Sequence, residues 1–316
     1  MPRAKNFFRC FFVLLYFSIA WIHAQNQEES VVLDIENGSV KGTLLIPQTD
    51  TKIPIALIIA GSGPTDRNGN NMMMTNNHLK LLAEGLAEKG IASLRYDKRG
   101  VGKSSFQDFD ERDLRFEDYS NDALGLLKQL QADTRFSKLV VIGHSEGSLL
   151  GILACQQIKV DRFISLAGAG QNASAFIKEQ LEKQAPSLLE EALPIFDKLE
   201  QGETVEKVPT ALLSIFRSSV QPYMISWIKY DPKMEISKLE IPILIVHGTT
   251  DIQLEVSEAE LLMEGNPKAQ LEIVEGMNHI LKIADKEYLP NLQTYSNPDL
   301  PLANGLTDLL SDFILE

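Results

Sequence analysis

The sequence predicts an α/β protein with a mostly parallel sheet that carries helices on both faces. Short apolar segments typical of strands alternate along most of the chain with longer segments of helical spacing. Strands and helices that alternate in this way usually build a parallel sheet between two helical layers. Several of the expected strands, such as 53–59, are apolar throughout, as expected for strands that are buried on both faces.

The elements follow in order from a hairpin at the N-terminal side. Segments 31–35 and 40–46 alternate apolar and polar residues around Asn37-Gly38, a dipeptide that favours a tight hairpin turn. The further strands are expected at 53–59, 91–96, 139–142, 163–168, 241–247 and 271–274, and helices at 78–89, 116–132 and 302–313.

One long segment interrupts this alternation. Between 171 and 238 the spacing is helical only, with expected helices at 176–184, 187–199 and 212–230. We therefore predict a helical cap at 171–238, inserted after the sixth strand. It would divide the core into a first part, 25–170, and a second part, 239–316.

The N-terminus has the features of a secretory signal. Arg3, Lys5 and Arg9 precede an apolar stretch at 10–22, which is too short to span a bilayer comfortably. The sequence predicts a signal peptide at 1–24 that is cleaved after Ala24, and an uncleaved anchor is the alternative. The mature protein is then expected to be periplasmic or secreted, with no stable membrane partner.

Composition excludes several classes of partner. The chain has 316 residues, of which 44% are hydrophobic, and its net charge of −13 becomes about −16 without the first 24 residues. Such an acidic surface repels phosphate backbones, which argues against nucleic acid. Only Cys155 remains after cleavage, so we expect no internal disulfide and no multi-cysteine metal site. We also expect no other metal and no cofactor. The oligomeric state stays open, a homodimer included.

The motif Gly143-His144-Ser145-Glu146-Gly147 is the strongest chemical signal. It follows the expected strand 139–142 and precedes an apolar helix, so the chain must reverse sharply between them. Small residues two before and two after Ser145 permit that turn, which would expose the hydroxyl on a strained backbone. We predict that Ser145 is a nucleophile; the alternative is a tight turn with a buried serine.

A serine nucleophile needs a base and a group that orients the base. His279 is the one histidine in a loop after a late strand, and it follows Ser145 in the chain. Asp251 follows the strand 241–247 and precedes His279 by 28 residues. We predict that His279 is the base and Asp251 its partner. A surface histidine, or an aspartate that caps the next helix, is the alternative.

The developing negative charge on the substrate oxygen also needs donors. The amide of Glu146, directly after the nucleophile, is one candidate. The loop Ala60-Gly61-Ser62-Gly63 follows another strand and is rich in small residues, which lets the backbone approach a substrate. We predict the amides of Glu146 and Ser62 as the oxyanion hole, with Gly63 as the alternative to Ser62.

Together these motifs resemble the α/β-hydrolase superfamily. The chain is most similar to bacterial carboxylesterases and serine-aminopeptidase-like hydrolases with a helical cap. The landmarks that carry the resemblance occur in the family's order: the Ser145 motif, Asp97-x-Arg99-Gly100-x-Gly102-x-Ser104, His247-Gly248-x-x-Asp251 and Asn278-His279. The resemblance covers Val31 to the C-terminus and implies an α/β-hydrolase fold. One departure is Ala60-Gly61, where many relatives have His-Gly.

Residues that contact the substrate are harder to predict. Arg67, in a polar loop, is a candidate for meeting a substrate carboxylate. Met73 is a candidate for lining an acyl pocket, although core filling explains the methionines better. Tyr223 and Trp227 belong to the predicted cap, and we expect them to line an apolar cleft. Gly100-Val101-Gly102-Lys103-Ser104 suggests a phosphate loop, but Asp97 stands where that motif needs glycine. We therefore expect a structural loop whose charges bond to backbone.

These residues predict a serine hydrolase. Our first hypothesis is a carboxylesterase that acts on short to medium acyl esters. A serine aminopeptidase or amidase on the same three residues is the first alternative. It would need a carboxylate to hold the substrate amine, and Glu190, Glu191 and Asp197 of the cap are available. A binding protein of the same fold without activity is the second alternative.

Overall fold

The computed structural model describes residues 26–316. The predicted signal peptide and its cleavage after Ala24 lie outside the described residues and stay predictions. Within the described residues, no helix has both the length and the apolar character needed to cross a membrane.

The described strands form one nine-stranded sheet, in the order β1-β2-β4-β3-β6-β7-β8-β9, with the short β5 paired to β2. Their bounds are β1 Gln27–Ile35, β2 Gly38–Ile46, β3 Ile53–Ile59, β4 Ala92–Tyr96, β5 Ser105–Phe106, β6 Phe136–His144, β7 Arg162–Leu166, β8 Ile243–Gly248 and β9 Gln270–Val274. From β4 to β9 all neighbouring strands are parallel, whereas β1, β2 and β5 pair antiparallel. The predicted α/β fold with a mostly parallel sheet is confirmed.

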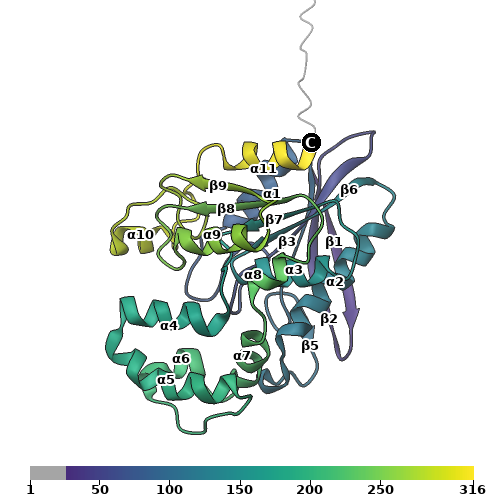
Figure 1. The fold of residues 1–316 in the computed structure, drawn as a ribbon. Helices are drawn as coiled ribbons and strands as arrows, with labels where there is room; N and C mark the ends of the chain where they lie inside the picture. The colour runs from purple at the N-terminus through teal and green to yellow at the C-terminus, as the bar shows by residue number, and fades with distance from the viewer. Residues whose placement is uncertain (1–25) are drawn as a thin grey trace, which may run out of the picture.

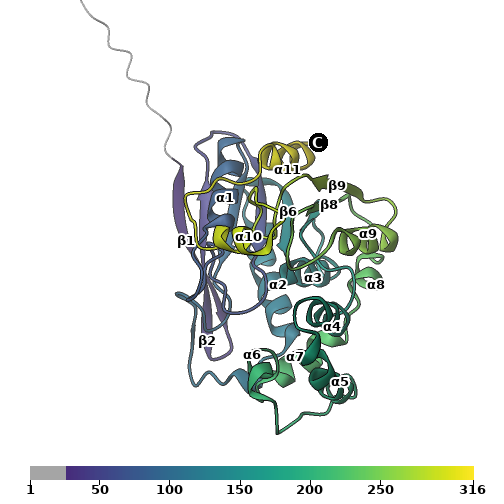
Figure 2. The same cartoon turned by 90° about the vertical axis from the view of Figure 1, so that its left-hand side faces the viewer.

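Helices cover both faces of this sheet (Figures 1 and 2). The helices are α1 His78–Glu88, α2 Phe116–Ala132, α3 Glu146–Cys155, α4 Ala173–Gln184, α5 Pro186–Glu200, α6 Leu213–Phe216, α7 Gln221–Ile228, α8 Pro232–Ile236, α9 Val256–Gly265, α10 Tyr288–Thr294 and α11 Leu306–Leu315. Apolar residues of α1 and α11 pack on one face of the sheet. Those of α2, α3 and α9 pack on the other.

The hairpin prediction is confirmed at its turn. Asn37 has φ 62°, the left-handed conformation that an Asn-Gly turn requires, and Gly38 begins β2. β1 begins at Gln27, four residues before the expected strand, because its polar first residues pair along the edge of β2. Such an edge strand needs no apolar alternation there, so the sequence pattern missed it.

Helices α4 to α8 lie between β7 and β8, inside the range 171–238 predicted for the cap. They gather at one end of the sheet, next to α2 and α3 (Figure 1). Their apolar residues continue the core on the α2–α3 side, with Ile195, Phe196 and Phe216 almost fully buried. The cap thus covers the end of the sheet at which β6 and β7 finish. The predicted helix 212–230 is broken: α6 ends at Phe216 and α7 begins at Gln221.

Candidate active site

Ser145 occupies a sharp turn between β6 and α3. Its backbone angles, φ 55° and ψ −124°, are rare for a residue with a side chain. The turn is held because the Ser145 amide donates to the carbonyl of Leu166, at the end of β7, over 2.9 Å. This hydrogen bond to the neighbouring strand holds the strained backbone in place. Ser145 is half-buried and lines a cleft.

The glycines on either side of Ser145 are required by sterics. A Cβ on Gly143 would lie 2.3 Å from the carbonyl oxygen of Gly147, and a Cβ on Gly147 would lie 2.3 Å from the carbonyl oxygen of Ile59. Side-chain carbons do not approach backbone oxygens so closely. The motif therefore needs glycine at 143 because the turn folds back onto Gly147, and glycine at 147 because the turn packs against β3.

His279 and Asp251 lie together at the ends of β9 and β8. His279 Nδ1 is 2.7 Å from Asp251 Oδ2, so the ring donates to the carboxylate. Asp251 Oδ1 accepts from the amides of Gln253 and Leu254 at 2.7 and 3.0 Å. These bonds shape the loop before α9. They do not cap that helix, whose N-cap residue is Glu255.

The Asp251 carboxylate is buried yet held in its charged form. Burial alone would raise its pKa, but the charge and hydrogen bond of His279, followed by His247, bring the pKa below the usual value for aspartate. An ionised Asp251 is what fixes the Nδ1–H tautomer of His279 and leaves Nε2 free to accept a proton.

His144 links the serine turn to the histidine loop. Its Nε2 donates to the backbone oxygen of His279 over 2.7 Å, and the two ring centroids are 5.0 Å apart. No hydrogen bond joins the Ser145 hydroxyl to His279 within residues 26–316. Catalytic hydrogen bonds often tighten only when substrate binds, so this spacing is compatible with the predicted pair.

His78, at the start of α1, was not among the predicted site residues. Its Nε2 lies 3.4 Å from His144 Nδ1, and both rings are buried. Burial lowers the pKa of His144 to about 3, and lowers that of His78 as well. The two imidazole rings are therefore uncharged. They pack against each other, and the His144 ring in turn packs against His279. Nothing local in the sequence around His78 indicates this contact, because it joins residues 66 positions apart.

The two predicted oxyanion donors flank Ser145. Ser62 and Glu146 both line the cleft beside Ser145. A Cβ on Gly61 would come within 3.0 Å of the Ser145 Cβ, so the Gly61 backbone lies close to Ser145. In the part of the chain described by the structure, neither the Ser62 nor the Glu146 amide donates a hydrogen bond. Both remain available to an oxygen of the substrate.

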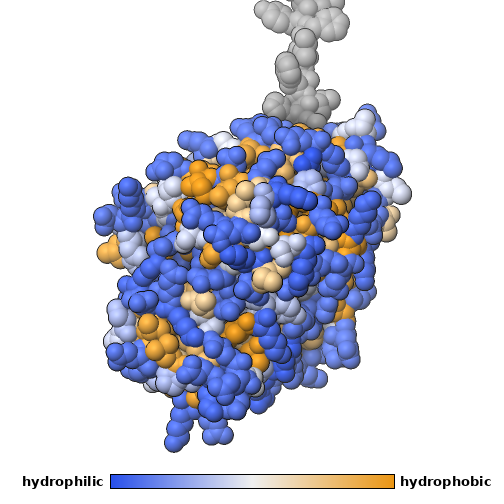
Figure 3. Space-filling view, viewed as in Figure 1, coloured by the Kyte–Doolittle hydropathy of each residue, from blue (hydrophilic) through white to orange (hydrophobic). Residues whose placement is uncertain are grey.

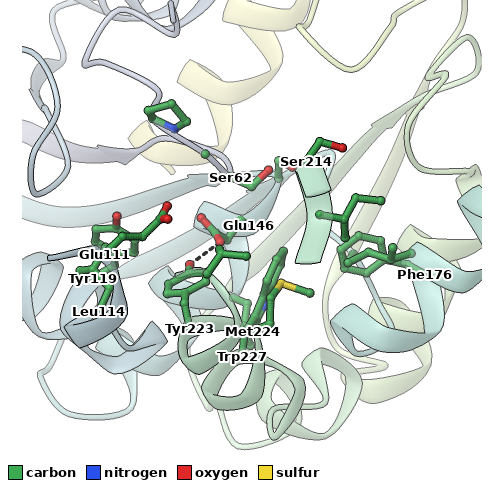
Figure 4. A pocket seen from close by; sticks show the side chains of 18 of the residues that line it. Ser62, Glu111, Leu114, Tyr119, Glu146, Phe176, Ser214, Tyr223, Met224 and Trp227 are labelled. Atoms are coloured by element: carbon green, nitrogen blue, oxygen red, sulfur yellow. Dashed lines mark hydrogen bonds between the residues drawn. The ribbon is translucent and has the colours of Figure 1, made fainter. Parts of the chain in front are cut away.

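A cleft of about 490 Å³ opens at Ser145, between the core and the cap. Tyr223, Met224 and Trp227 of α7 form one wall, and Phe176 of α4 lies beside them, with its ring centroid 5.7 Å from that of Trp227 (Figure 4). Trp227 stacks on Phe116 with ring centroids 5.7 Å apart. Apolar residues also gather on the cap surface in Figure 3. Tyr223 and Trp227 thus lie where a substrate would contact them, whereas His279 and Asp251 are not among the residues that line the cleft.

Every charged side chain that lines the cleft, among the residues described, has a partner of opposite charge. Arg99 binds Asp122 through two bonds of 2.7 and 2.8 Å, and Arg217 binds Glu111. Glu146 accepts from Lys98 Nζ at 2.8 Å and from the hydroxyl of Tyr223. The interior of the cleft is therefore close to neutral.

The structure corrects two predicted substrate contacts. Arg67 is buried and does not line the cleft; its Nε and NH2 group bind Asp97, and its NH1 group donates to Thr43. A guanidinium that is fully engaged by protein partners holds no substrate carboxylate. Met73 is 85% exposed and also lies outside the cleft, so it fills neither an acyl pocket nor the core.

The loop after β4 is structural, as expected, but only part of its charge bonds to backbone. Asp97 accepts from the amides of Arg67 and Lys103, and Ser104 donates to the Asp97 carbonyl. Lys98 and Arg99, in contrast, bind carboxylates of α3 and α2. Gly102 has φ 56°, and a Cβ there would lie 2.4 Å from the Asp97 carboxylate.

Comparison with known proteins gives consistent results. The profile of the family described as serine aminopeptidase, S33, matches residues 72–235, about half of the chain. Esterase EstD of Thermotoga maritima is 27% identical over 257 residues, which cover 78% of this chain and 59% of EstD. A probable aminopeptidase of Bacillus subtilis, YbaC, is 26% identical over 142 residues, covering 45% of this chain and 42% of its own length. The chain thus spans less than two thirds of these relatives.

Solved structures share the fold at low identity. Est1E from Butyrivibrio proteoclasticus superposes with a TM-score of 0.59 at 17% identity, covering 91% of this chain and 99% of Est1E. A Pyrococcus furiosus esterase superposes with a TM-score of 0.58 at 13% identity, covering 96% of this chain and 94% of that one. With the S33 profile over half of its length and this fold, the chain belongs to the serine aminopeptidase S33 family of α/β hydrolases.

Proposed function

We propose that this protein is a serine carboxylesterase that hydrolyses short to medium acyl esters. The observation that carries the proposal is the 2.7 Å bond between His279 and Asp251, joined through His144 to the strained turn at Ser145. A nucleophile, a base and an orienting carboxylate in this arrangement serve acyl transfer. The resemblance to EstD, an esterase, supports the same chemistry.

The reaction would run through a covalent acyl-enzyme. Ser145 Oγ attacks the ester carbonyl while His279 Nε2 takes the hydroxyl proton, and the Ser62 and Glu146 amides bind the resulting oxyanion. The tetrahedral intermediate expels the alcohol, which receives the proton from His279. Water then attacks the acyl-enzyme with His279 again as base, and the carboxylic acid leaves as Ser145 regains its proton.

The charges of the cleft favour a neutral ester over an aminopeptidase substrate. A free amino terminus needs an unpaired carboxylate, and both oxygens of Glu146 are already bound. Glu190, Glu191 and Asp197 of the cap are exposed and do not line the cleft. An ammonium group would therefore lose its hydration in this cleft without gaining a partner.

The test compares the full chain with Ser145→Ala on p-nitrophenyl butyrate. We expect the substitution to lower turnover by about three to six orders of magnitude, because it removes the nucleophile. Ser148→Ala is the matched control: Ser148 lies three residues further on, in the first turn of α3, but its hydroxyl pairs with Ser165 over 2.7 Å and it does not line the cleft. Equal rates for wild type and Ser145→Ala would overturn the proposal.

Alanine p-nitroanilide, assayed in parallel, separates the two chemistries. An esterase should hydrolyse the butyrate ester with a kcat/KM at least about a hundredfold above that for the anilide. The reverse preference would replace the esterase proposal by an aminopeptidase. An absence of turnover, together with a Ser145 that does not react with a fluorophosphonate, would support a binding protein.

A further inference from the structure

A buried carboxylate stands directly beside the nucleophile. The side chain of Glu146 is 2% exposed, and Glu146 lines the cleft next to Ser145. Its backbone amide is a predicted oxyanion donor. A lone buried carboxylate would be strongly unfavourable, so its partners decide where this residue sits. The two carboxylate oxygens are held by two different parts of the chain.

Lys98 holds one oxygen from the core. Its Nζ is 2.8 Å from Glu146 Oε2 and 4.9 Å from the ring centroid of Tyr119, and its side chain is 1% exposed. Lys98 lies two residues after the end of β4, so it approaches Glu146 from the central sheet. This ion pair neutralises the carboxylate and fixes one side of it.

Tyr223 holds the other oxygen from the cap. Its hydroxyl donates to Glu146 Oε1 (Figure 4). The ring is enclosed by aromatic neighbours: the centroids of Tyr119 and Phe116 lie 5.7 and 5.9 Å away. Because the ring is packed in this way, the hydroxyl is aimed at Glu146 for as long as α7 keeps its place.

We propose that Tyr223 is a positioning residue that couples the cap to the oxyanion-binding amide of Glu146. The inference rests on the proposed function. Carboxylate and amide belong to one residue at the first turn of α3, so clamping the carboxylate between core and cap fixes the direction of the amide. A cap displaced from the core would release one clamp. The oxyanion hole is then complete only when the cap is seated over the substrate.

Tyr223→Phe tests the coupling, because it removes the hydroxyl and keeps the ring. Removing an oxyanion donor outright lowers kcat about a hundredfold or more, so a misdirected donor should cost less. We expect kcat for p-nitrophenyl butyrate to fall about tenfold while KM changes less than about threefold. Labelling of Ser145 by a fluorophosphonate should slow by a similar factor, since that reaction uses the same donors.

Tyr230→Phe is the matched control. Tyr230 follows α7, and its hydroxyl donates to Glu117 of α2 over 2.9 Å. It is thus a second tyrosine-to-glutamate bond between cap and core, but it lies outside the cleft. We expect its kcat and KM to stay within about twofold of wild type. An equal loss in both variants would mean that any cap contact matters, which overturns a specific role for Tyr223.

A double variant shows whether the loss of kcat in Tyr223→Phe depends on Glu146. Lys98→Met combined with Glu146→Met removes both charges together and leaves no unpaired buried ion. Adding Tyr223→Phe to this background should change kcat less than about twofold, because the acceptor is gone. A tenfold loss that persists there would overturn the inference, as would an unchanged kcat for Tyr223→Phe alone.

The outcome for wild type separates the two proposals. An active wild type whose kcat is insensitive to Tyr223→Phe would overturn the positioning role and leave the esterase standing. A wild type that neither hydrolyses esters nor reacts with the fluorophosphonate would overturn both.

Discussion

Gly147 shows how a single residue is determined by the space around it. It lies where the first turn of α3 meets the end of β3, and a Cβ there would lie 2.3 Å from the Ile59 carbonyl and 2.8 Å from that of Ala60. Both obstacles are backbone oxygens at the buried C-terminal end of β3, which cannot move aside as a flexible side chain can. Only glycine allows helix and strand to come so close.

Gly147→Ala should therefore lower the free energy of unfolding by about 2 to 4 kcal/mol, because core backbone must shift to admit the methyl group. Chemical denaturation at constant pH measures it. Gly151→Ala is the control in the same helix: its Cβ would meet only side-chain atoms, at 3.0 Å, and alanine favours the helix. Comparable losses in the two variants would contradict the steric explanation.

Asp97 connects two loops, one after β3 and one after β4. It receives the guanidinium and the amide of Arg67 from the loop after β3, and the amide of Lys103 from the loop after β4. Burial would raise the pKa of this carboxyl, yet the bonds from Arg67 and Lys103 bring it below its usual value. One buried carboxylate thus ties together the ends of two adjacent parallel strands.

Asp97→Ala should lower the free energy of unfolding by about 3 kcal/mol or more, because Arg67 would be left buried without its charge partner. Urea denaturation checks this. Glu84→Gln is the control: Glu84 pairs with Lys80 at 3.7 Å on the exposed face of α1, and surface pairs of this kind contribute about 0.5 kcal/mol. A loss no greater than in this control would show that Asp97 is dispensable to the fold.

The elements themselves were predictable where pattern and length were strong. Helix α2 occupies Phe116–Ala132, the range that its apolar spacing predicts. Among the short elements that the sequence did not predict, β5 has only two residues and α8 only five, Pro232–Ile236. Helix α10 carries exposed apolar side chains at Tyr288 and Leu289, which obscure an amphipathic pattern. Short elements form because the surrounding fold holds them, and local sequence carries little of that information.

At the scale of the whole molecule, three buried histidines make stability depend on pH. Burial is the main cause of a lowered pKa in His78, His144 and His247. Unfolding returns each ring to a pKa near 6.5, so the unfolded chain binds more protons below that pH. Stability should therefore be complete above the unfolded value and decrease as the pH falls toward the folded one.

His144 has a pKa of about 3 and should account for about 2 kcal/mol of the stability lost between about pH 7.5 and pH 5. His144→Gln keeps a donor for the His279 carbonyl but does not titrate. Unfolding free energies of both proteins at the two pH values measure the difference, and the variant should lose about 2 kcal/mol less. Equal losses in the two proteins would mean that folding does not lower the pKa of His144.

The proximity of His279 and Asp251 was predictable because it follows from a rule that holds for all parallel sheets. The carboxyl ends of parallel strands meet at one edge of a sheet, so residues after β8 and β9 had to be neighbours. The bond of 2.7 Å between the two side chains realises that rule. Their roles in catalysis stay predictions, which the activity of Ser145→Ala addresses.

The turn at Ser145, the hairpin at Asn37 and the alternation of strands and helices can all be read from the amino-acid sequence. Each of these depends on backbone sterics or periodicity within a few residues, which neighbouring letters express directly. Three other features depend on how the chain folds: Arg67 is buried against Asp97, Met73 is exposed, and Glu146 joins Lys98 to Tyr223. Glu146 is 48 positions from Lys98 and 77 from Tyr223, so those contacts exist only once the sheet and cap have brought distant segments together.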